Sequence, residues 1–306
     1  MTLSPKISVL VPVHNGERHL AECLDSILKQ DFRDMEILIS DDDSTDQSRE
    51  LIKQYAARDA RIRWWKNPQR VGLTANSNIC LRAAAGEYVK YVHQDDLLLS
   101  VSSVRKLATA LDENPSAVLA GSQPHLTGSK SKPIILSTHS RLFAGKEMVV
   151  TCFERNNNLI GQPTLTLFRK DNARRGFDER FTDSMDFEMW CHLLEQGDFV
   201  YQAEPLATWR VHATHQTART RINGVSDHES LLLMETYYAK AWLRELATER
   251  MLFTQIYYLR KKHGRQALPL TATMMSQLTP GRYRMWWLKH KSSSPLIKIS
   301  KHLLPS

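Results

Sequence analysis

The sequence lacks the patterns that would place the protein across a membrane or in an oxidising compartment. It has no run of 18 apolar residues, so we expect no transmembrane helix. Its first residues show neither the long apolar core nor the small-residue cleavage site of a signal peptide. Its four cysteines have no CxxC spacing, so neither a zinc site nor a disulfide framework is indicated. We therefore expect a cytoplasmic protein with reduced thiols.

Two common phosphate-binding motifs are also missing. The turns that could hold a phosphate read PVHNG at residues 12–16 and RVGLT at residues 70–74. Neither matches the GxGxxG of dinucleotide-binding folds or the GxxxxGK[ST] of P-loop proteins. Nicotinamide-dependent and P-loop activities therefore lose support, although these glycines and amides could still line a phosphate or ribose pocket.

Acidic residues are absent from residues 251–306, which hold ten Lys or Arg. The whole chain has a formal net charge of +8, so the first 250 residues sum to about −2. Aromatic residues such as Trp286 and Trp287 lie among the tail cations, a combination that suits an anionic membrane surface. An ordinary solvated helical face is the alternative, and no nucleic-acid motif accompanies the charge. We hypothesise peripheral binding at the inner membrane and expect no nucleic-acid partner.

Short β-rich runs alternate with helix-period segments over the first 125 residues. This alternation predicts an α/β fold with a parallel sheet and helices on both faces. The second stretch, residues 115–212, mixes short strands with helices, and one or two helices are expected over residues 225–263. The expected strands are 7–11, 35–40, 61–65, 87–92, 117–120, 165–168 and 199–202, and the expected helices include 17–30, 45–58, 72–85 and 186–196.

Two acidic turns follow buried strands, DDDSTD at residues 41–46 and HQDD at residues 93–96. In open α/β sheets ligands bind at the carboxyl ends of the strands. Crowded carboxylates need a cation or hydrogen-bond donors, and oxygen ligands suit Mg²⁺ or Mn²⁺, which brings substrate phosphates with it. We predict that Asp95 binds metal or phosphate and that Asp41 accepts a hydrogen bond from a base or ribose. Helix capping explains Ser44 and Asp46 better, and explains Asp96 equally well.

Taken together, these segments resemble family 2 glycosyltransferases with the GT-A fold. The matching segments are VLVPVHNG at 9–16, DDDSTD at 41–46, GLTANSN at 72–78 and GEYVKYVHQDDL at 86–97. A weaker continuation runs through GQPT at 161–164, DFEMW at 186–190 and WRVH at 209–212. Beyond about residue 225 no resemblance is found.

The resemblance implies an inverting transfer of a sugar from a nucleoside diphosphate donor, by default a UDP-sugar, with Mn²⁺ or Mg²⁺ as cofactor. The acceptor would be a glycan or a lipid-linked glycan in cell-surface polysaccharide assembly. The GT-A domain would cover residues 1–220, with a nucleotide-sugar-binding half at 1–100 and an acceptor half at 101–220. A Rossmann-like nucleotide-binding sheet would form its centre, and residues 221–306 would form a helical basic extension.

The resemblance also assigns roles to single residues. Asp95 would bind the metal, His212 would reach the metal or the diphosphate, and Asp186 would be the general base. For Asp186, an N-cap of the helix that begins there is the alternative. The residues expected to contact the nucleotide sugar are Pro12, Val13, Asn15, Asp41, Asp42, Arg70, Gly72, Asn76, Gln94 and Asp95.

Three positions depart from the family pattern. His93 stands where many members have the first Asp of the metal-binding motif, Asp43 replaces a Gly, and Met185 precedes Asp186 where an acidic residue is common. His93 and Met185 leave open a silent module that binds a nucleotide sugar without turnover. A second alternative is a sugar nucleotidyltransferase, which can share a nucleotide-binding α/β core and a metal but would make the sugar nucleotide and pyrophosphate.

Overall fold

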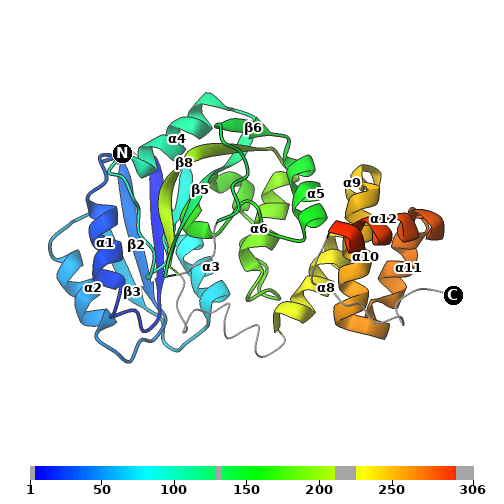
Figure 1. Cartoon of the computed structure of the whole chain (residues 1–306). Helices are drawn as coiled ribbons and strands as arrows, with labels where there is room; N and C mark the ends of the chain where they lie inside the picture. Colours follow the sequence, from blue (N-terminus) through cyan, green and yellow to red (C-terminus); the bar gives the residue numbers. More distant parts are fainter. Residues whose placement is uncertain (1–3, 129–132, 211–224, 294–306) are drawn as a thin grey trace. The chain divides into compact units, whose positions relative to one another are not determined.

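The computed structural model describes residues 4–128, 133–210 and 225–293 (Figure 1). The chain divides into two compact units, one of residues 1–149 with 158–230 and the other of residues 150–157 with 231–306. The first unit thus runs ten residues past the boundary expected at residue 220, and the second unit includes a short segment from the middle of the chain.

The sheet of the first unit has eight strands in the order β3-β2-β1-β4-β7-β5-β8-β6. Strands β3, β2, β1 and β4 are parallel to one another, as the alternation of strands and helices predicted. Strand β7 runs antiparallel to both β4 and β5, β5 and β8 are again parallel to each other, and β6 runs antiparallel to β8. The strands are β1 Ile7–Val13, β2 Met35–Asp41, β3 Ile62–Lys66, β4 Tyr88–Tyr91, β5 Ala117–Thr127, β6 Arg141–Phe143, β7 Thr166–Arg169 and β8 Asp198–Arg210.

Helices cover both faces of the parallel strands. On one face, a cluster of buried apolar residues joins β1 and β2 to the apolar stripe of α1 and to residues of α2 and α4. Helix α3 lies on the opposite side of the sheet from α1 and α2 (Figure 1). Every residue of β1 is buried, as a strand covered on both faces requires. These helices are α1 Leu20–Leu28, α2 Ser48–Ala56, α3 Leu73–Ala83 and α4 Ser103–Glu113.

The second half of this unit adds helix α6, Met185–Leu194, which starts one residue before its predicted position. Its Trp190 is fully buried and donates its indole N–H to the carbonyl of Gly161 at 2.8 Å. Helix α5, Gly145–Arg155, begins in this half, and its residues from Val150 on belong to the second unit. The short 3-10 helices Pro163–Leu165 and Lys170–Ala173 complete this half.

The second unit is helical. Residues 225–263, where one or two helices were expected, form three, because the backbone is extended at Lys240, Ala247 and Thr248. Thr248 caps α10 by accepting the backbone N–H of Met251 at 3.1 Å. No helix in the described ranges combines the length and apolar content needed to cross a membrane. The helices are α8 Val225–Tyr238, α9 Ala241–Leu246, α10 Glu249–His263, α11 Leu268–Met275 and α12 Pro280–Ser293.

Candidate functional site

A cavity of about 840 Å³ lies at the carboxyl ends of β1, β2 and β4. The turns after these strands form one wall, and residues 182–186 before and within α6 form part of another. This is the position at which open α/β sheets bind ligands.

The turn after β1 is fixed by contacts to two neighbouring turns. The side chain of Gln94 accepts the backbone N–H of His14 at 2.8 Å and donates to the carbonyl of the same residue at 3.0 Å. Asn15 donates its backbone N–H to Ser44, and its side-chain oxygen accepts the backbone N–H of Thr45. A Cβ at Gly16 would lie 2.6 Å from the side-chain oxygen of Gln94, so the Gln94 side chain that holds His14 would have to shift.

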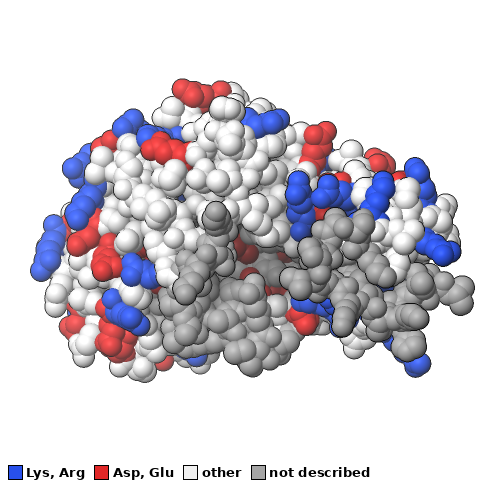
Figure 2. All heavy atoms as spheres, in the orientation of Figure 1, with Lys and Arg blue, Asp and Glu red and all other residues white. Residues whose placement is uncertain are grey.

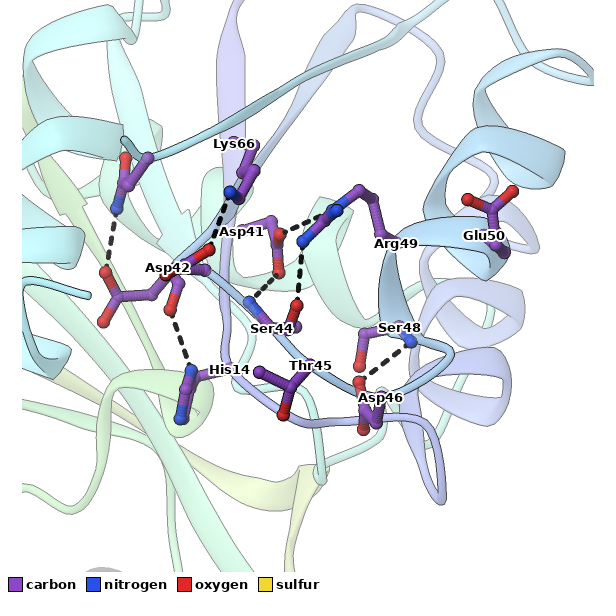
Figure 3. Close-up of polar contacts among 12 residues, drawn as sticks. His14, Asp41, Asp42, Ser44, Thr45, Asp46, Ser48, Arg49, Glu50 and Lys66 are labelled. Atoms are coloured by element: carbon purple, nitrogen blue, oxygen red, sulfur yellow. Dashed lines mark hydrogen bonds and ion pairs between the residues drawn. The ribbon is translucent and has the colours of Figure 1, made fainter. Parts of the chain in front are cut away.

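Asp42, after β2, holds the loop that follows β3 (Figure 3). One carboxylate oxygen accepts from the side-chain amide of Asn67 at 3.0 Å and from the backbone N–H of Val71 at 2.8 Å. The other accepts the backbone N–H of Gly72 at 2.8 Å, and Gly72 has a φ of +88°, which favours glycine. Asp42 therefore keeps this loop against the cavity, which both Asp42 and Gly72 line.

Asp41 was expected at the nucleotide, but it does not line the cavity. Its side chain is fully buried away from the cavity, where it pairs with Arg49 at 3.3 Å and accepts the backbone N–H of Ser44 (Figure 3). Successive side chains of a strand point to opposite faces, so only one of the two adjacent carboxylates reaches the cavity. The structure places Asp42 there.

Asp43 has a φ of +57°, in the left-handed region, which explains the glycine that the family pattern has at this position. Aspartate is one of the few other residues that adopt this conformation at modest cost. Lys66 lies 2.7 Å from the Asp43 carboxylate, and this hydrogen bond holds the pKa of Asp43 below its usual range.

The turn after β4 separates two adjacent carboxylates. Asp95 lines the cavity. Asp96 is buried, accepts the hydroxyl of Thr164 at 2.7 Å and the backbone N–H of Arg210 at 2.9 Å. Burial, with the nearby charge of Asp95, raises the pKa of Asp96 to about 7. Because α4 begins only at Ser103, Asp96 is not a helix cap but a link between β4, the 3-10 helix at Pro163–Leu165 and β8.

A buried lysine holds the segment on which the turn after β4 packs. Lys90 of β4 is fully buried, and its ammonium group donates to the carbonyls of Thr164 and Thr166, the latter at 3.0 Å. Burial lowers the pKa of Lys90 to about 7. Sequence patterns did not indicate this residue, because a lysine in a strand normally reaches solvent.

Asp186 is the second residue of α6, so it is not the N-cap, which is Ser184. Its carboxylate faces the cavity, accepts the backbone N–H of Phe187 at 2.7 Å and lies 3.4 Å from the side-chain amide of Asn158. Burial raises the pKa of Asp186 to about 7, and the charges of Asp183 and Glu229 act in the same direction. A carboxyl group with a pKa near neutrality can take up a proton at physiological pH.

The cavity brings together most of the predicted ligand residues, while His212 lies outside the described residues. Residues that were not predicted also line it, including Arg18, His19 and Gln162. The side-chain oxygen of Gln162 is buried with no hydrogen-bond partner within the described structure. The predicted residues that line the cavity are Pro12, Val13, Asn15, Asp42, Arg70, Gly72, Asn76, Gln94, Asp95 and Asp186.

Metal ligands are sparse in the described part of the chain. Over residues 4–128, 133–210 and 225–293, no group of three or more His, Cys, Asp or Glu could hold a metal ion. In the turn after β4, Asp95 contributes one carboxylate to the cavity. This donor set fits Mg²⁺ or Mn²⁺ bound in the way typical of nucleotide sites, through one or two carboxylates and the phosphates of the substrate.

Comparison with known proteins identifies the family. Residues 8–177, more than half of the chain, match the family model of glycosyl transferase family 2, and the chain belongs to this family. It is 36% identical over 214 residues to the uncharacterized glycosyltransferase EpsJ of Bacillus subtilis, covering 66% of this chain and 62% of that protein. It is 39% identical over 97 residues, 31% of each chain, to the GalNAc(5)-diNAcBac-PP-undecaprenol beta-1,3-glucosyltransferase of Campylobacter jejuni.

Solved structures show the same fold. S. aureus TarS 1–349 in complex with UDP-GlcNAc superposes with a TM-score of 0.62 at 16% identity, over 97% of this chain and 95% of that chain. The mannosyltransferase PcManGT of Pyrobaculum calidifontis, in complex with GDP-Man and Mn²⁺, gives a TM-score of 0.60 at 16% identity, over 95% and 85%. The predicted GT-A fold is thereby confirmed.

Proposed function

We propose that the protein is an inverting glycosyltransferase that moves a sugar from a UDP-sugar to a hydroxyl of a glycan or glycolipid in cell-surface polysaccharide assembly. The observation that carries the proposal is that one cavity holds both Asp95, from the turn after β4, and Asp186, from α6. The UDP-GlcNAc bound by TarS supports UDP as the nucleotide. The undecaprenol-linked acceptor in the name of the Campylobacter relative supports a lipid-linked acceptor.

The turns after β1 and β2 and the loop after β3 would hold the nucleoside. Asp42 keeps that loop in place and, with Asn15 and Asn76, presents polar groups to the cavity. We assign the base contact to Asp42 rather than Asp41, because only Asp42 reaches the cavity. Arg70 would pair with the diphosphate, since a guanidinium recognises phosphate oxygens through charge-assisted hydrogen bonds.

Asp95 would hold a Mn²⁺ or Mg²⁺ ion together with the diphosphate, and the predicted contribution of His212 remains a proposal. When bound, the ion would stabilise the negative charge of the leaving nucleoside diphosphate. The Mn²⁺ in PcManGT with its GDP-Man supports this assignment. We do not assign Asp96 as a ligand, because it is buried and does not line the cavity.

Asp186 would act as general base. The acceptor oxygen forms a bond to the anomeric carbon from the face opposite the nucleotide, and its proton passes to the Asp186 carboxylate. The bond from the anomeric carbon to the diphosphate oxygen breaks with its electron pair leaving on the diphosphate, which inverts the anomeric centre. Asn158, at 3.4 Å from the carboxylate, orients it toward the cavity.

Thermal unfolding tests the donor site. UDP, GDP, dTDP and CMP are added separately, each with and without Mn²⁺, to the wild type, to Asp95→Ala and to the control Asp171→Ala, whose carboxylate is 82% exposed. A ligand that binds only the native state raises the melting temperature by mass action. We expect UDP to do so in a Mn²⁺-dependent way in the wild type and the control and not in Asp95→Ala. An unchanged melting temperature with every nucleotide would contradict the proposal.

The helical unit would bind an anionic membrane. Lys289 lies over the ring of Trp286 at 4.9 Å, Leu288 is 53% exposed, and Arg284 is exposed on the same helix, α12. Lys and Arg side chains are visible on this unit in Figure 2. Such cationic and aromatic pairs suit the headgroup region of a membrane.

Vesicle sedimentation tests this membrane contact. Wild type should bind vesicles that contain phosphatidylglycerol more than vesicles of phosphatidylcholine alone. Reversal of Arg284 and Lys289 to Glu should abolish the difference. The matched control is Lys53→Glu, on an exposed part of α2 in the first unit. Equal binding by all three proteins would exclude α12 as the membrane contact.

A further inference from the structure

A carboxylate of helix α8 holds the segment that leads into the helix carrying the proposed general base. Glu229 is 2% exposed, and its carboxylate accepts the backbone N–H groups of Thr182 at 2.6 Å, Asp183 at 3.0 Å and Ser184 at 2.7 Å. These three residues come directly before α6, and Ser184 is its N-cap. Ser184 makes no capping bond through its side chain. Glu229 thus fixes, from a distant part of the sequence, the backbone at which α6 begins.

Ser226, in the same turn of α8, makes a second contact with the segment before α6. The hydroxyl of Ser226 donates to the carboxylate of Asp183, which lines the cavity together with Thr182. Glu229 and Ser226 are one helical turn apart, so they reach the same segment from one face of α8. The three residues before α6 are therefore held through both their backbone and a side chain.

The contacts of Glu229 and Ser226 lie next to the proposed general base. Asp186 is in the first turn of α6, directly after the residues that they hold, and its carboxylate is in the cavity. The negative charge of Glu229 is balanced by the amides and by the positive end of the α6 dipole. It also lies near enough to Asp186 to raise the pKa of that carboxyl group. The carboxylates near Asp186 are Asp183 from the same segment and Glu229 from α8, and the loop at 158–161 contributes the neutral Asn158.

We propose that Glu229 is a positioning residue for catalysis, which fixes residues 182–184 and thereby sets the Asp186 carboxylate at the acceptor side of the cavity. This proposal rests on the proposed function of Asp186. It gives a role to a carboxylate that lies 43 residues after Asp186 in the chain. Both oxygens of Glu229 accept backbone N–H groups, and a glutamine, with one acceptor oxygen, could not make the same set of contacts.

Glu229→Gln and Glu229→Asp test the role, with Glu235→Gln, an exposed residue of the same helix, as the matched control. Glutamine has one acceptor oxygen and no charge, while aspartate keeps the charge but is shorter. The measurements are release of UDP from UDP-GlcNAc with Mn²⁺ as a function of pH, and the Kd of UDP with Mn²⁺. A displacement of the base by about 1 Å can cost about 100-fold in rate.

We expect Glu229→Gln to lower kcat by about 10- to 100-fold and to leave the Kd of UDP within about twofold. The acid limb of the pH profile of this variant should move to lower pH, since the charge of Glu229, which contributes to the raised pKa of Asp186, is gone. Glu229→Asp should lose rate without this move, and Glu235→Gln should match the wild type. An unchanged kcat in Glu229→Gln, a Kd of UDP that rises in step with the loss of kcat, or an equal loss in Glu235→Gln would overturn the proposal.

A second measurement separates this proposal from the proposed function. If the wild type itself releases no UDP, the donor or the function is wrong, and urea unfolding of Asp186→Asn, Glu229→Gln and the double variant decides the positioning role. Interacting residues give non-additive changes in the free energy of unfolding, whereas independent ones add within about 0.5 kcal/mol. Additivity would overturn the coupling of Glu229 to Asp186, and non-additivity at neutral pH would support it.

Discussion

Replacing Asp186 by Asn should remove activity while stabilising the protein, and the stabilisation should depend on pH. Burial raises the pKa of this carboxyl group from 3.8 to about 7. The native state therefore holds the proton more tightly than the unfolded state, and the free energy of unfolding of the wild type should fall as the pH rises from about 4 to about 7. Above that pH the loss is complete and constant.

The magnitude follows from the two pKa values. One pKa unit corresponds to about 1.4 kcal/mol, and some contact of the carboxylate with solvent in the cavity reduces the total, so the cost of the charge is about 2–4 kcal/mol. Asn has nearly the same shape and no charge. We expect Asp186→Asn to match the wild type near about pH 4 and to be about 2–4 kcal/mol more stable at about pH 8.

Urea unfolding followed by tryptophan fluorescence at several pH values measures this difference, with Asp171→Asn as an exposed control. In the same variant, loss of the general base should lower the rate of sugar transfer by about 10²- to 10⁴-fold, with the Kd of the donor unchanged. A stability difference that is the same at every pH, or a variant that is less stable than the wild type above neutrality, would refute the assigned pKa. Retained transfer would refute the role as base.

Five further substitutions test the turns and the packing. Asp42→Asn should weaken UDP binding by about 1–3 kcal/mol, measured by calorimetry, while Asp41→Asn should lower the free energy of unfolding by a similar amount, measured in urea. The reverse result would restore Asp41 as the nucleotide contact. Asp43→Gly should change stability by less than about 1 kcal/mol and Asp43→Val should cost about 1–2 kcal/mol, because of the left-handed backbone; equal costs would exclude this explanation. Gly145→Ala should lower the free energy of unfolding by about 3 kcal/mol or more, since its Cβ would lie 1.9 Å from the carbonyl oxygen of Gly197, and a melting temperature like that of the wild type would contradict this packing.

The part of the site that could be predicted from the sequence depends on strand ends. Because the carboxyl ends of parallel strands meet at one edge, the turns after β1, β2 and β4 had to lie together, and with them Asn15 and Asp95. Helix α6 could be placed from its apolar face, which brought Asp186 to its first turn. The predicted strands at 117–120 and 199–202 were too short, since β5 and β8 continue as long paired strands with polar residues in their second halves.

What could not be predicted depends on geometry that a linear pattern does not contain. The choice between Asp41 and Asp42 is set by which face of β2 each side chain takes at the strand end, and both residues carry the same carboxylate. The antiparallel insertion of β7 between β4 and β5 joins segments far apart in sequence. Glu229 and Lys90 gave no signal either, because their partners are backbone groups, which every residue has.

Helix α8 has a practical consequence for dissecting the protein. Its first residues, to Ser230, belong to the unit that contains the cavity, and the remainder belongs to the helical unit. A fragment cut at residue 220, where the family resemblance suggested a boundary, would lose Ser226 and Glu229 and leave residues 182–184 without these contacts. A truncated enzyme meant for crystallisation or for donor screening should therefore extend through Tyr238, and the inactivity of a shorter fragment would say nothing about whether the helical unit is needed for sugar transfer.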